Sequence, residues 1–293
     1  MLTTILNTLK LISTSLQVLI KEPVFLVLGA LWSLALVAWL GTLGLALEAG
    51  GTIDRIADRG NVQIIDFVFL VFAHLVACFI TLYFQAASVI AAYHRLEGAY
   101  GSLGEGIEAA GVRLGAIFTW AAFAGTIGFV LKRFRKNASL DQTGGIIRGW
   151  SRAAPLVVPV MMIEGSPPLA SLHRADELFF ETWGSRTVPK ISFRLAYALV
   201  VIPAALAAGG LYALTQAIVP AVALASILIL IGATAVRASE AIFAVDLYAF
   251  ATSGDGAIYP RRMLQQAFVS REGRLPPAPP SDYEGWRGGL SRP

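Results

Sequence analysis

The sequence predicts an all-α fold, a polytopic integral membrane helix bundle with about six membrane-embedded segments and two interfacial amphipathic helices. The chain is 56% hydrophobic and only 14% charged, whereas soluble domains carry about a quarter charged residues. Its hydrophobic residues gather in long blocks, which is typical of membrane helices. Two further segments have apolar residues on one side only, which is typical of helices that lie at the membrane surface.

The first apolar block is residues 24–47, which contain no charge. A helix of this length measures about 36 Å, enough to cross a bilayer with some tilt. Pro220 marks a very short turn, so the last two segments are expected to be antiparallel neighbours. The further segments are residues 67–93, 114–131, 148–163, 195–215 and 218–250.

The two interfacial helices are predicted at residues 1–23 and 168–183. In the first, leucine and isoleucine recur at helical spacing, and polar residues fill the other side. In the second, Ser166 is the expected N-cap and Gly184 the expected C-terminal cap. Its predicted apolar face consists of Leu169, Leu172, Ala175, Phe179 and Trp183. Residues 24–252 form the membrane domain, and residues 253–293 are expected to form a cytoplasmic tail.

Lysine and arginine positions predict the orientation, because cytoplasmic loops carry an excess of both. With six crossings and a cytoplasmic N-terminus, 15 of these residues lie inside and 8 outside. The exception is the loop at residues 132–152, which would place six basic residues outside with one acid. We expect a multi-pass protein of the cell inner (plasma) membrane with both termini cytoplasmic.

Re-entrant segments at about residues 108–163 are the alternative to true crossings. If the third and fourth segments enter and leave on the cytoplasmic face, 21 basic residues lie inside and 2 outside. Gly125 and Gly128 interrupt the third segment, and the apolar part of the fourth is short. Both arrangements stay open from the sequence. The basic cluster suited to anionic lipid headgroups is Lys132, Arg133, Arg135 and Lys136.

Three ionisable residues within or beside the apolar segments are candidates for a functional site, because charges are costly in a membrane. Arg237 and Glu240 are three residues apart on one helical face, a spacing that also suits an ion pair ending the segment. His74 lies in the second segment, and a hydrogen-bonded packing role is the alternative for it.

The sequence gives no signature of catalysis or of a cofactor. It contains no Walker, G-x-G-x-x-G or G-x-S-x-G motif. The single cysteine, Cys78, excludes an intrachain disulfide and a cysteine-based metal site. We therefore expect a protein that is not an enzyme, with no cofactor, no metal and no nucleic acid partner.

One stretch is more distinctive: a V-V-P-V run ending at Val160, then Glu164-Gly165, then Thr182-Trp183-Gly184, with an L-Y pair at Leu247-Tyr248. This block resembles an uncharacterised family of bacterial and archaeal polytopic membrane proteins. A looser likeness exists to the membrane domain of some glycerophosphodiester phosphodiesterases. The resemblance implies a membrane fold without an assigned activity. Its candidate residues are Pro159, Glu164, Gly165, Trp183, Gly184 and Tyr248.

These observations favour a scaffold, assembly factor or accessory subunit that works through association with membrane lipids and with other membrane proteins or a second copy of the chain. The alternative is a small transporter or channel, because broken membrane segments often line substrate pathways.

Overall fold

The computed structural model describes residues 13–15, 17–52, 55, 63–98, 102–134, 153–184, 187–189, 193–256 and 258–270. It confirms the all-α membrane helix bundle. Among these residues, four helices are long and apolar enough to cross a membrane: α2 (Pro23–Ala49), α4 (Ile64–Leu96), α9 (Phe193–Thr215) and α10 (Ile218–Ser253). Each begins and ends within three residues of its predicted segment.

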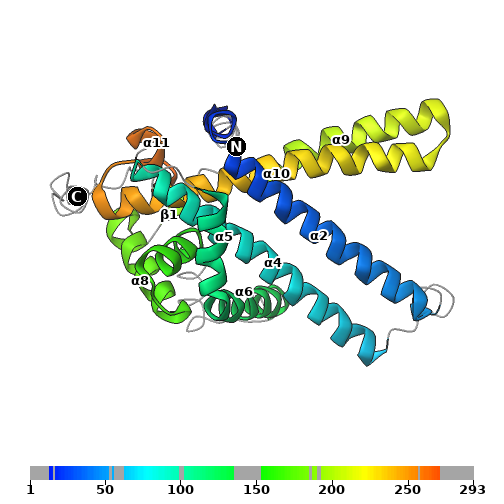
Figure 1. Cartoon of the computed structure of the whole chain (residues 1–293), viewed down its shortest axis with the longest axis horizontal. Coiled ribbons are helices and arrows are strands. Elements are labelled where there is room, and N and C mark those ends of the chain that lie inside the picture. The colour runs from blue at the N-terminus through cyan, green and yellow to red at the C-terminus, as the bar shows by residue number, and fades with distance from the viewer. Residues whose placement is uncertain are drawn as a thin grey trace.

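The four long helices form two hairpins. Helix α2 packs on α4, α9 packs on α10, and α10 also contacts α2 and α4. Figure 1 shows that the two hairpins diverge toward one side of the molecule. Apolar residues on these outer parts, among them Leu45, Ile64 and Leu206, are exposed, as expected for surfaces that contact lipid. The turn between α9 and α10 falls at Gln216, and Pro220 lies in the first turn of α10, where proline is tolerated.

Two bent helix pairs occupy the other side of the molecule. Helix α5 (Leu103–Val112) meets α6 (Leu114–Phe134) at 75°, and the helix Ala153–Glu164 meets α8 (Pro168–Trp183) at 119°. The last turn of Ala153–Glu164 is a π-helix, η1 (Val160–Glu164). Helix α5 was not among the segments predicted from the sequence. The capping box formed by Ser102 and Glu105 starts this helix.

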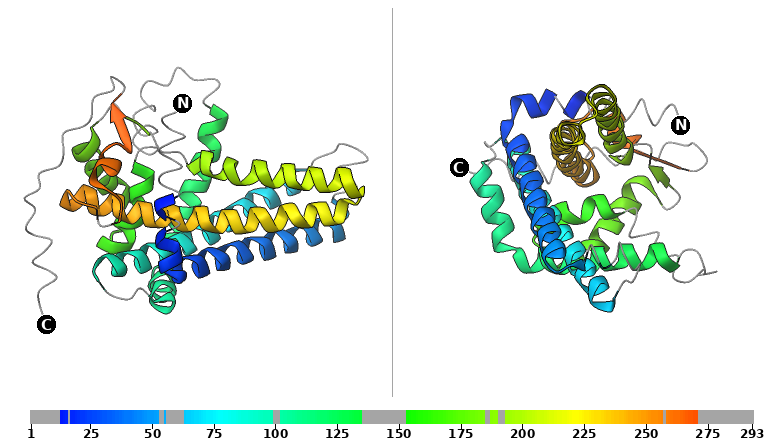
Figure 2. Two further views of the ribbon diagram at one scale, coloured as in Figure 1. Left: turned by 90° about the horizontal axis from the view of Figure 1, so that it is seen from above. Right: turned by 90° about the vertical axis from the view of Figure 1, so that its right-hand side faces the viewer.

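Helices α5 and α6 run across the long helices. Figure 1 shows α6 almost end-on while α4 lies along the picture, and the right view of Figure 2 shows α6 lengthwise. This direction differs from that of a third helix crossing the membrane beside the other four, and it fits the re-entrant alternative. Lys132 and Arg133 belong to the last turn of α6. Arg135, Lys136 and the rest of the loop to Arg152 lie outside the described residues.

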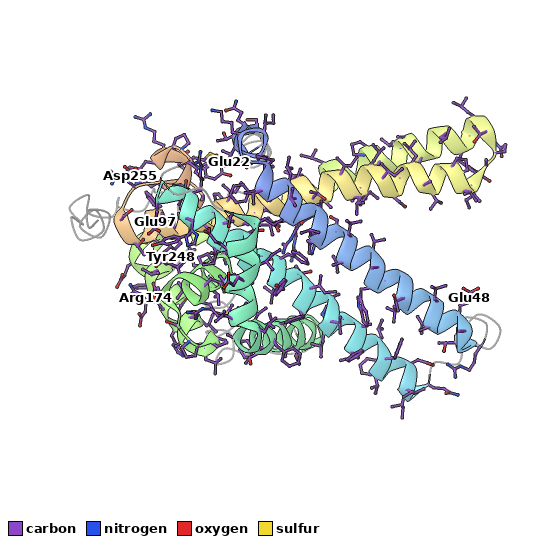
Figure 3. All side chains as sticks on the ribbon, viewed as in Figure 1. Glu22, Glu48, Glu97, Arg174, Tyr248 and Asp255 are labelled. Atoms are coloured by element: carbon purple, nitrogen blue, oxygen red, sulfur yellow. The ribbon has the colours of Figure 1, made fainter. Side chains whose placement is uncertain are left out.

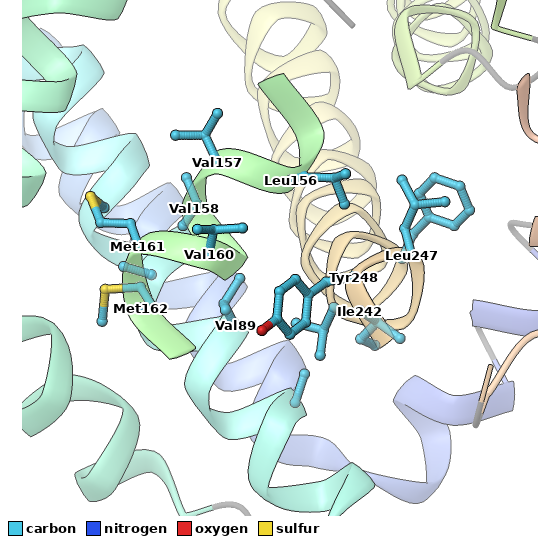
Figure 4. Packing of buried hydrophobic residues seen from close by; sticks show 14 of the residues in the cluster. Val89, Leu156, Val157, Val158, Val160, Met161, Met162, Ile242, Leu247 and Tyr248 are labelled. Atoms are coloured by element: carbon cyan, nitrogen blue, oxygen red, sulfur yellow. The ribbon is translucent and has the colours of Figure 1, made fainter. Parts of the chain in front are cut away.

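The buried core lies where these elements converge, in a part of the molecule that we call the base: residues 86–96, 103–112, 153–183 and 238–253. Alanines at positions 86, 87, 91 and 92 of α4 are fully buried there. Figure 4 shows Val160 near Val89 of α4 and Tyr248 of α10, and Leu156 beside α10, and all four belong to one buried cluster. Small side chains on α4 allow the other elements to approach its backbone closely.

Helix α8 covers one side of the base with the predicted boundaries. Ala175, Phe179 and Trp183 are buried as expected, but Leu169 is 58% exposed. The expected N-cap at Ser166 was wrong by one residue, because Pro167 holds the N-cap position. The carbonyls of Ser166 and Pro167 instead accept hydrogen bonds from the hydroxyl of Ser171.

A short two-stranded sheet and helix α11 (Arg261–Gln265) complete the base. Strand β1 (Thr187–Pro189) pairs antiparallel with β2 (Phe268–Ser270). Of the predicted N-terminal interfacial helix, residues 13–15 and 17–21 are helical. Its first twelve residues and the tail from residue 271 lie outside the described residues.

The contact between α5 and α4 gives a stability prediction. A Cβ on Gly106 would lie 2.6 Å from the carbonyl oxygen of Ala87, a distance at which two backbones must move apart. Gly106→Ala should therefore destabilise the protein by about 1–3 kcal/mol, measured by thermal unfolding in mild detergent. Gly111→Ala is the matched control, because nothing lies within 4 Å of that position. Equal effects of the two substitutions would contradict the packing.

Candidate functional site

The predicted pair Arg237 and Glu240 forms an ion pair through Nη1 of the arginine. Their side chains are only 16% and 18% exposed. The second guanidinium nitrogen of Arg237 lies 3.4 Å from the carbonyl oxygen of Thr81 and 3.5 Å from Oε1 of Gln85. The ion pair is therefore held against α4, on the side of α10 that faces the other hairpin.

Aromatic residues from the two remaining long helices complete this group. The guanidinium carbon of Arg237 lies 5.2 Å from the ring centroid of Trp32 on α2, a cation–π distance. The Trp32 indole donates a hydrogen bond of 3.2 Å to the hydroxyl of Thr81, and Tyr197 of α9 hydrogen-bonds Glu240. All four long helices thus meet at one polar group. We call it the junction: Trp32, Thr81, Gln85, Tyr197, Arg237 and Glu240.

A small pocket opens beside the junction between α2, α4 and α10. Arg237, Gln85 and Ser88 supply its polar groups, so that a water or a hydroxyl group fits its chemistry. Its lining residues are Leu28, Gly29, Trp32, Phe84, Gln85, Ser88, Arg237 and Ala238.

A second polar group lies in the base and contains two of the motif residues, Glu164 and Tyr248. The hydroxyl of Tyr248 donates a hydrogen bond of 3.0 Å to Oε1 of Glu164. Nε of Arg174, on α8, lies 3.7 Å from the same oxygen. Figure 3 places Tyr248 and Arg174 at the same end of the molecule, far from Glu48 at the tip of the first hairpin. Three elements therefore converge on one carboxylate.

The backbone at Glu164 has an unusual geometry that positions this carboxylate. Glu164 is the last residue of the π-helix, and Gly165 follows in the left-handed region with φ 76°. Arg113, at the bend between α5 and α6, donates a hydrogen bond of 3.2 Å to the carbonyl of Met161. Nη2 of its guanidinium also lies only 2.7 Å from the position that a Cβ on Gly165 would occupy. The two bends of the base are thus joined through Arg113.

The other motif residues hold the base together. Pro159 is the N-cap of the π-helix. The Trp183 indole donates a hydrogen bond of 3.2 Å to the carbonyl of Leu264 and packs against Phe179, Phe250 and Phe268. Gly184, with φ 81°, ends α8 as predicted.

His74 is not part of either polar group. It contacts Cys78, with 3.6 Å between Nε2 and Sγ, near the middle of α4. Within the part of the chain that the structure describes, no three His, Cys, Asp or Glu side chains are placed to hold a metal ion.

Asp246 is a buried polar residue that sequence reasoning missed. It was not among the candidate residues, and it is completely buried. Its carboxylate accepts hydrogen bonds from the backbone N–H groups of Ile258 (3.1 Å) and Tyr259 (2.7 Å). The hydroxyl of Tyr259 lies 2.7 Å from that of Ser15, and burial raises the pKa of Tyr259. Asp246 therefore holds the segment that follows α10 against α10. Tyr259 joins the same segment to the N-terminal helix.

The fold and the two polar groups define a polytopic α-helical membrane protein. A model of a family of unknown function, DUF6159, matches residues 64–258, which include the polar group at Glu164, all of the junction except Trp32, and most of the base. The chain belongs to this family. No curated protein and no solved structure matches it.

The junction gives a double-substitution prediction. Arg237→Met leaves the Glu240 carboxylate without its main partner in an apolar site. It should cost about 2–4 kcal/mol, somewhat below the cost in a fully buried pair. The double variant Arg237→Met/Glu240→Met leaves no unpaired charge and should recover most of that loss. Equilibrium unfolding in detergent measures both, with Arg262→Met on the exposed side of α11 as the control. A double variant as unstable as the single one would contradict the role of the pair.

Proposed function

We propose that this protein is a non-enzymatic integral membrane protein, a scaffold or accessory subunit that works by binding other membrane proteins. The observation that carries the proposal is the junction, where Arg237 and Glu240 pair with each other and with neutral groups of the same chain. Charges satisfied in this way fix the positions of four helices. In an enzyme or a carrier, charged groups of this kind need to contact a substrate and not only each other.

Helix α8 supplies a surface for association in this proposal. Its outer side carries the exposed apolar residues Leu169 and Phe180 next to the charged Glu177. This combination suits the level of the lipid headgroups, where an apolar side chain inserts and a charged one stays in water. The basic cluster predicted after α6 would add attraction to anionic lipids.

We propose that the residues of the motif block support this scaffold role. Glu164, Trp183 and Tyr248 come from three elements and meet other elements of the base. The looser likeness to the membrane domain of glycerophosphodiester phosphodiesterases remains a prediction. It concerns a membrane domain and brings no phosphodiesterase activity to this chain. Placement in the plasma membrane with both termini cytoplasmic also belongs to the proposal, on the basis of the arginines after residue 260.

A small transporter or channel is the second candidate. The observation in its favour is the pair of broken segments, with bends of 75° and 119° and a π-helix beside Glu164. Discontinuous helices frequently form substrate sites in transporters, and π-helices occur at functional sites.

The proposal predicts that partners are lost without loss of the fold when the outer side of α8 becomes polar. The full chain is purified from native membranes in mild detergent, and co-purifying proteins are quantified by mass spectrometry. Leu169→Ser/Phe180→Ser should reduce the main partner at least about tenfold, which corresponds to about 1.4 kcal/mol, at an unchanged melting temperature. Leu206→Ser on α9, at a position that is also exposed, is the control.

A transporter would be recognised by a different measurement, the flux of an ion or solute. Vesicles containing the purified chain would then carry an ion or solute flux, and that flux would fall with Glu240→Gln or His74→Ala. Such a flux, together with partner recovery that does not depend on α8, would overturn the scaffold proposal.

A further inference from the structure

The contacts of α6 with α4 show the relative direction of the two helices. The rings of Phe118 and Phe79 are 6.0 Å apart between centroids. Seven residues further along α6, a Cβ on Gly125 would lie 3.2 Å from Leu75 and 3.3 Å from Sγ of Cys78. Seven residues of helix measure about 10 Å, yet both contacts fall within residues 75–79. Helix α6 therefore crosses α4, as Figures 1 and 2 also show.

The crossing point lies far from both ends of the first hairpin. Trp39 of α2 donates a hydrogen bond of 3.1 Å to the carbonyl of Ala73, and Trp32 donates to Thr81. The stretch of α4 that holds α6 thus faces the middle of α2, which runs from Pro23 to Ala49. If the hairpin spans the bilayer, α6 lies at the depth of the hydrocarbon.

The outward side of α6 has the chemistry of a surface in contact with acyl chains. Its inward side buries Ile117, Trp120 and Ala121. Between Leu114 and Thr126, the part of α6 whose side chains are described, the exposed positions carry no charge, and the hydroxyl of Thr119 donates to the carbonyl of Gly115 within the helix. The exposed positions are Leu114, Gly115, Phe118, Thr119 and Thr126. An interfacial helix needs a charged or polar side, which α8 has and this part of α6 lacks.

The backbone groups of Arg113, the residue at the bend before α6, are bonded inside the protein. The backbone N–H of Arg113 donates to the carbonyl of Ala110, and the carbonyl of Arg113 accepts from Ile117. The side chain of Arg113 donates to Met161. Irregular backbone at membrane depth requires this internal satisfaction.

We propose that α5 and α6 form a re-entrant unit in which α6 lies in the hydrocarbon near the middle of the bilayer and its outward side contacts the acyl chains of the lipids. The unit enters and leaves on the side where α4 ends, at Leu96. Helix α6 packs beside α4, whose outer part also carries exposed apolar residues such as Leu70 and Phe72, and this argues for lipid as the occupant of the surface. This placement goes beyond the scaffold role and does not depend on it.

Labelling of single cysteines tests on which side of the membrane α6 ends. In a Cys78→Ala background, cysteines replace Glu97 at the end of α4, Gln63 before its start, and Lys132 near the end of α6. Vesicles of each orientation are treated with a membrane-impermeant maleimide. We expect Lys132→Cys and Glu97→Cys to react in the same vesicles, and Gln63→Cys in the opposite ones. Arg133→Cys replaces Lys132→Cys if that variant does not fold.

Two results would overturn the re-entrant placement. One is labelling at Lys132→Cys from the Gln63 side, which means that α6 crosses. The other is no labelling at Lys132→Cys from either side before detergent is added, which means that α6 does not return to the surface.

A spin label at residue 118 tests the depth independently of the topology. Phe118→Cys should collide more with oxygen, which concentrates in hydrocarbon, than with a water-soluble nickel chelate. Glu177→Cys on α8 is the aqueous control, because its side chain is 65% exposed. Equal or greater collision of Phe118→Cys with the nickel chelate would place α6 outside the hydrocarbon and overturn the proposal.

Discussion

Close packing around α4 is the interaction on which the rest of the structure depends. Lipid solvates apolar side chains as well as protein does, so the hydrophobic effect does not hold helices together within a bilayer. Van der Waals contact between closely approaching backbones takes its place. Helix α4 provides this contact with alanines at positions 86, 87, 91 and 92, and its neighbours provide glycines such as Gly106. Helices α2, α5, α6 and α10 and the π-turn all contact α4.

The junction adds a directional interaction to this packing. Van der Waals contact alone allows helices to slide, whereas a guanidinium with fixed donors accepts few arrangements. Arg237 meets Glu240, Gln85 and Trp32 at one level along the helices. On one side of this level the hairpins diverge with exposed apolar residues. On the other side lies the buried base, where Arg113 and Glu164 join the bent segments.

Features set by local sequence could be predicted, and those set by distant contacts could not. The long helices and α8 follow from hydrophobic length and periodicity, and Gly184 is a local stop signal. The spacing of Arg237 and Glu240 also predicted their pairing. Nothing near Trp32 or Tyr197 indicates that they complete the same group, because they lie on other helices. The π-turn at Glu164 depends on Arg113 and Tyr248, which are remote in sequence. Asp246 lies in an apolar stretch, and its backbone partners, Ile258 and Tyr259, lie in the segment that the sequence analysis assigned to the tail.

The most direct test of the central role of α4 is a disulfide between α4 and α6. A Cβ on Gly125 would lie 3.7 Å from Cβ of Cys78, close to the separation of about 3.8 Å in disulfides. Gly125→Cys should therefore form a disulfide with the native Cys78 upon mild oxidation in intact membranes, and Thr126→Cys on the exposed side should not. If α6 instead ran antiparallel beside α4, position 125 would lie about one turn or two further along, near Phe72. Efficient bonding of Gly125→Cys to Phe72→Cys in a Cys78→Ala chain, with none to Cys78, would contradict the account.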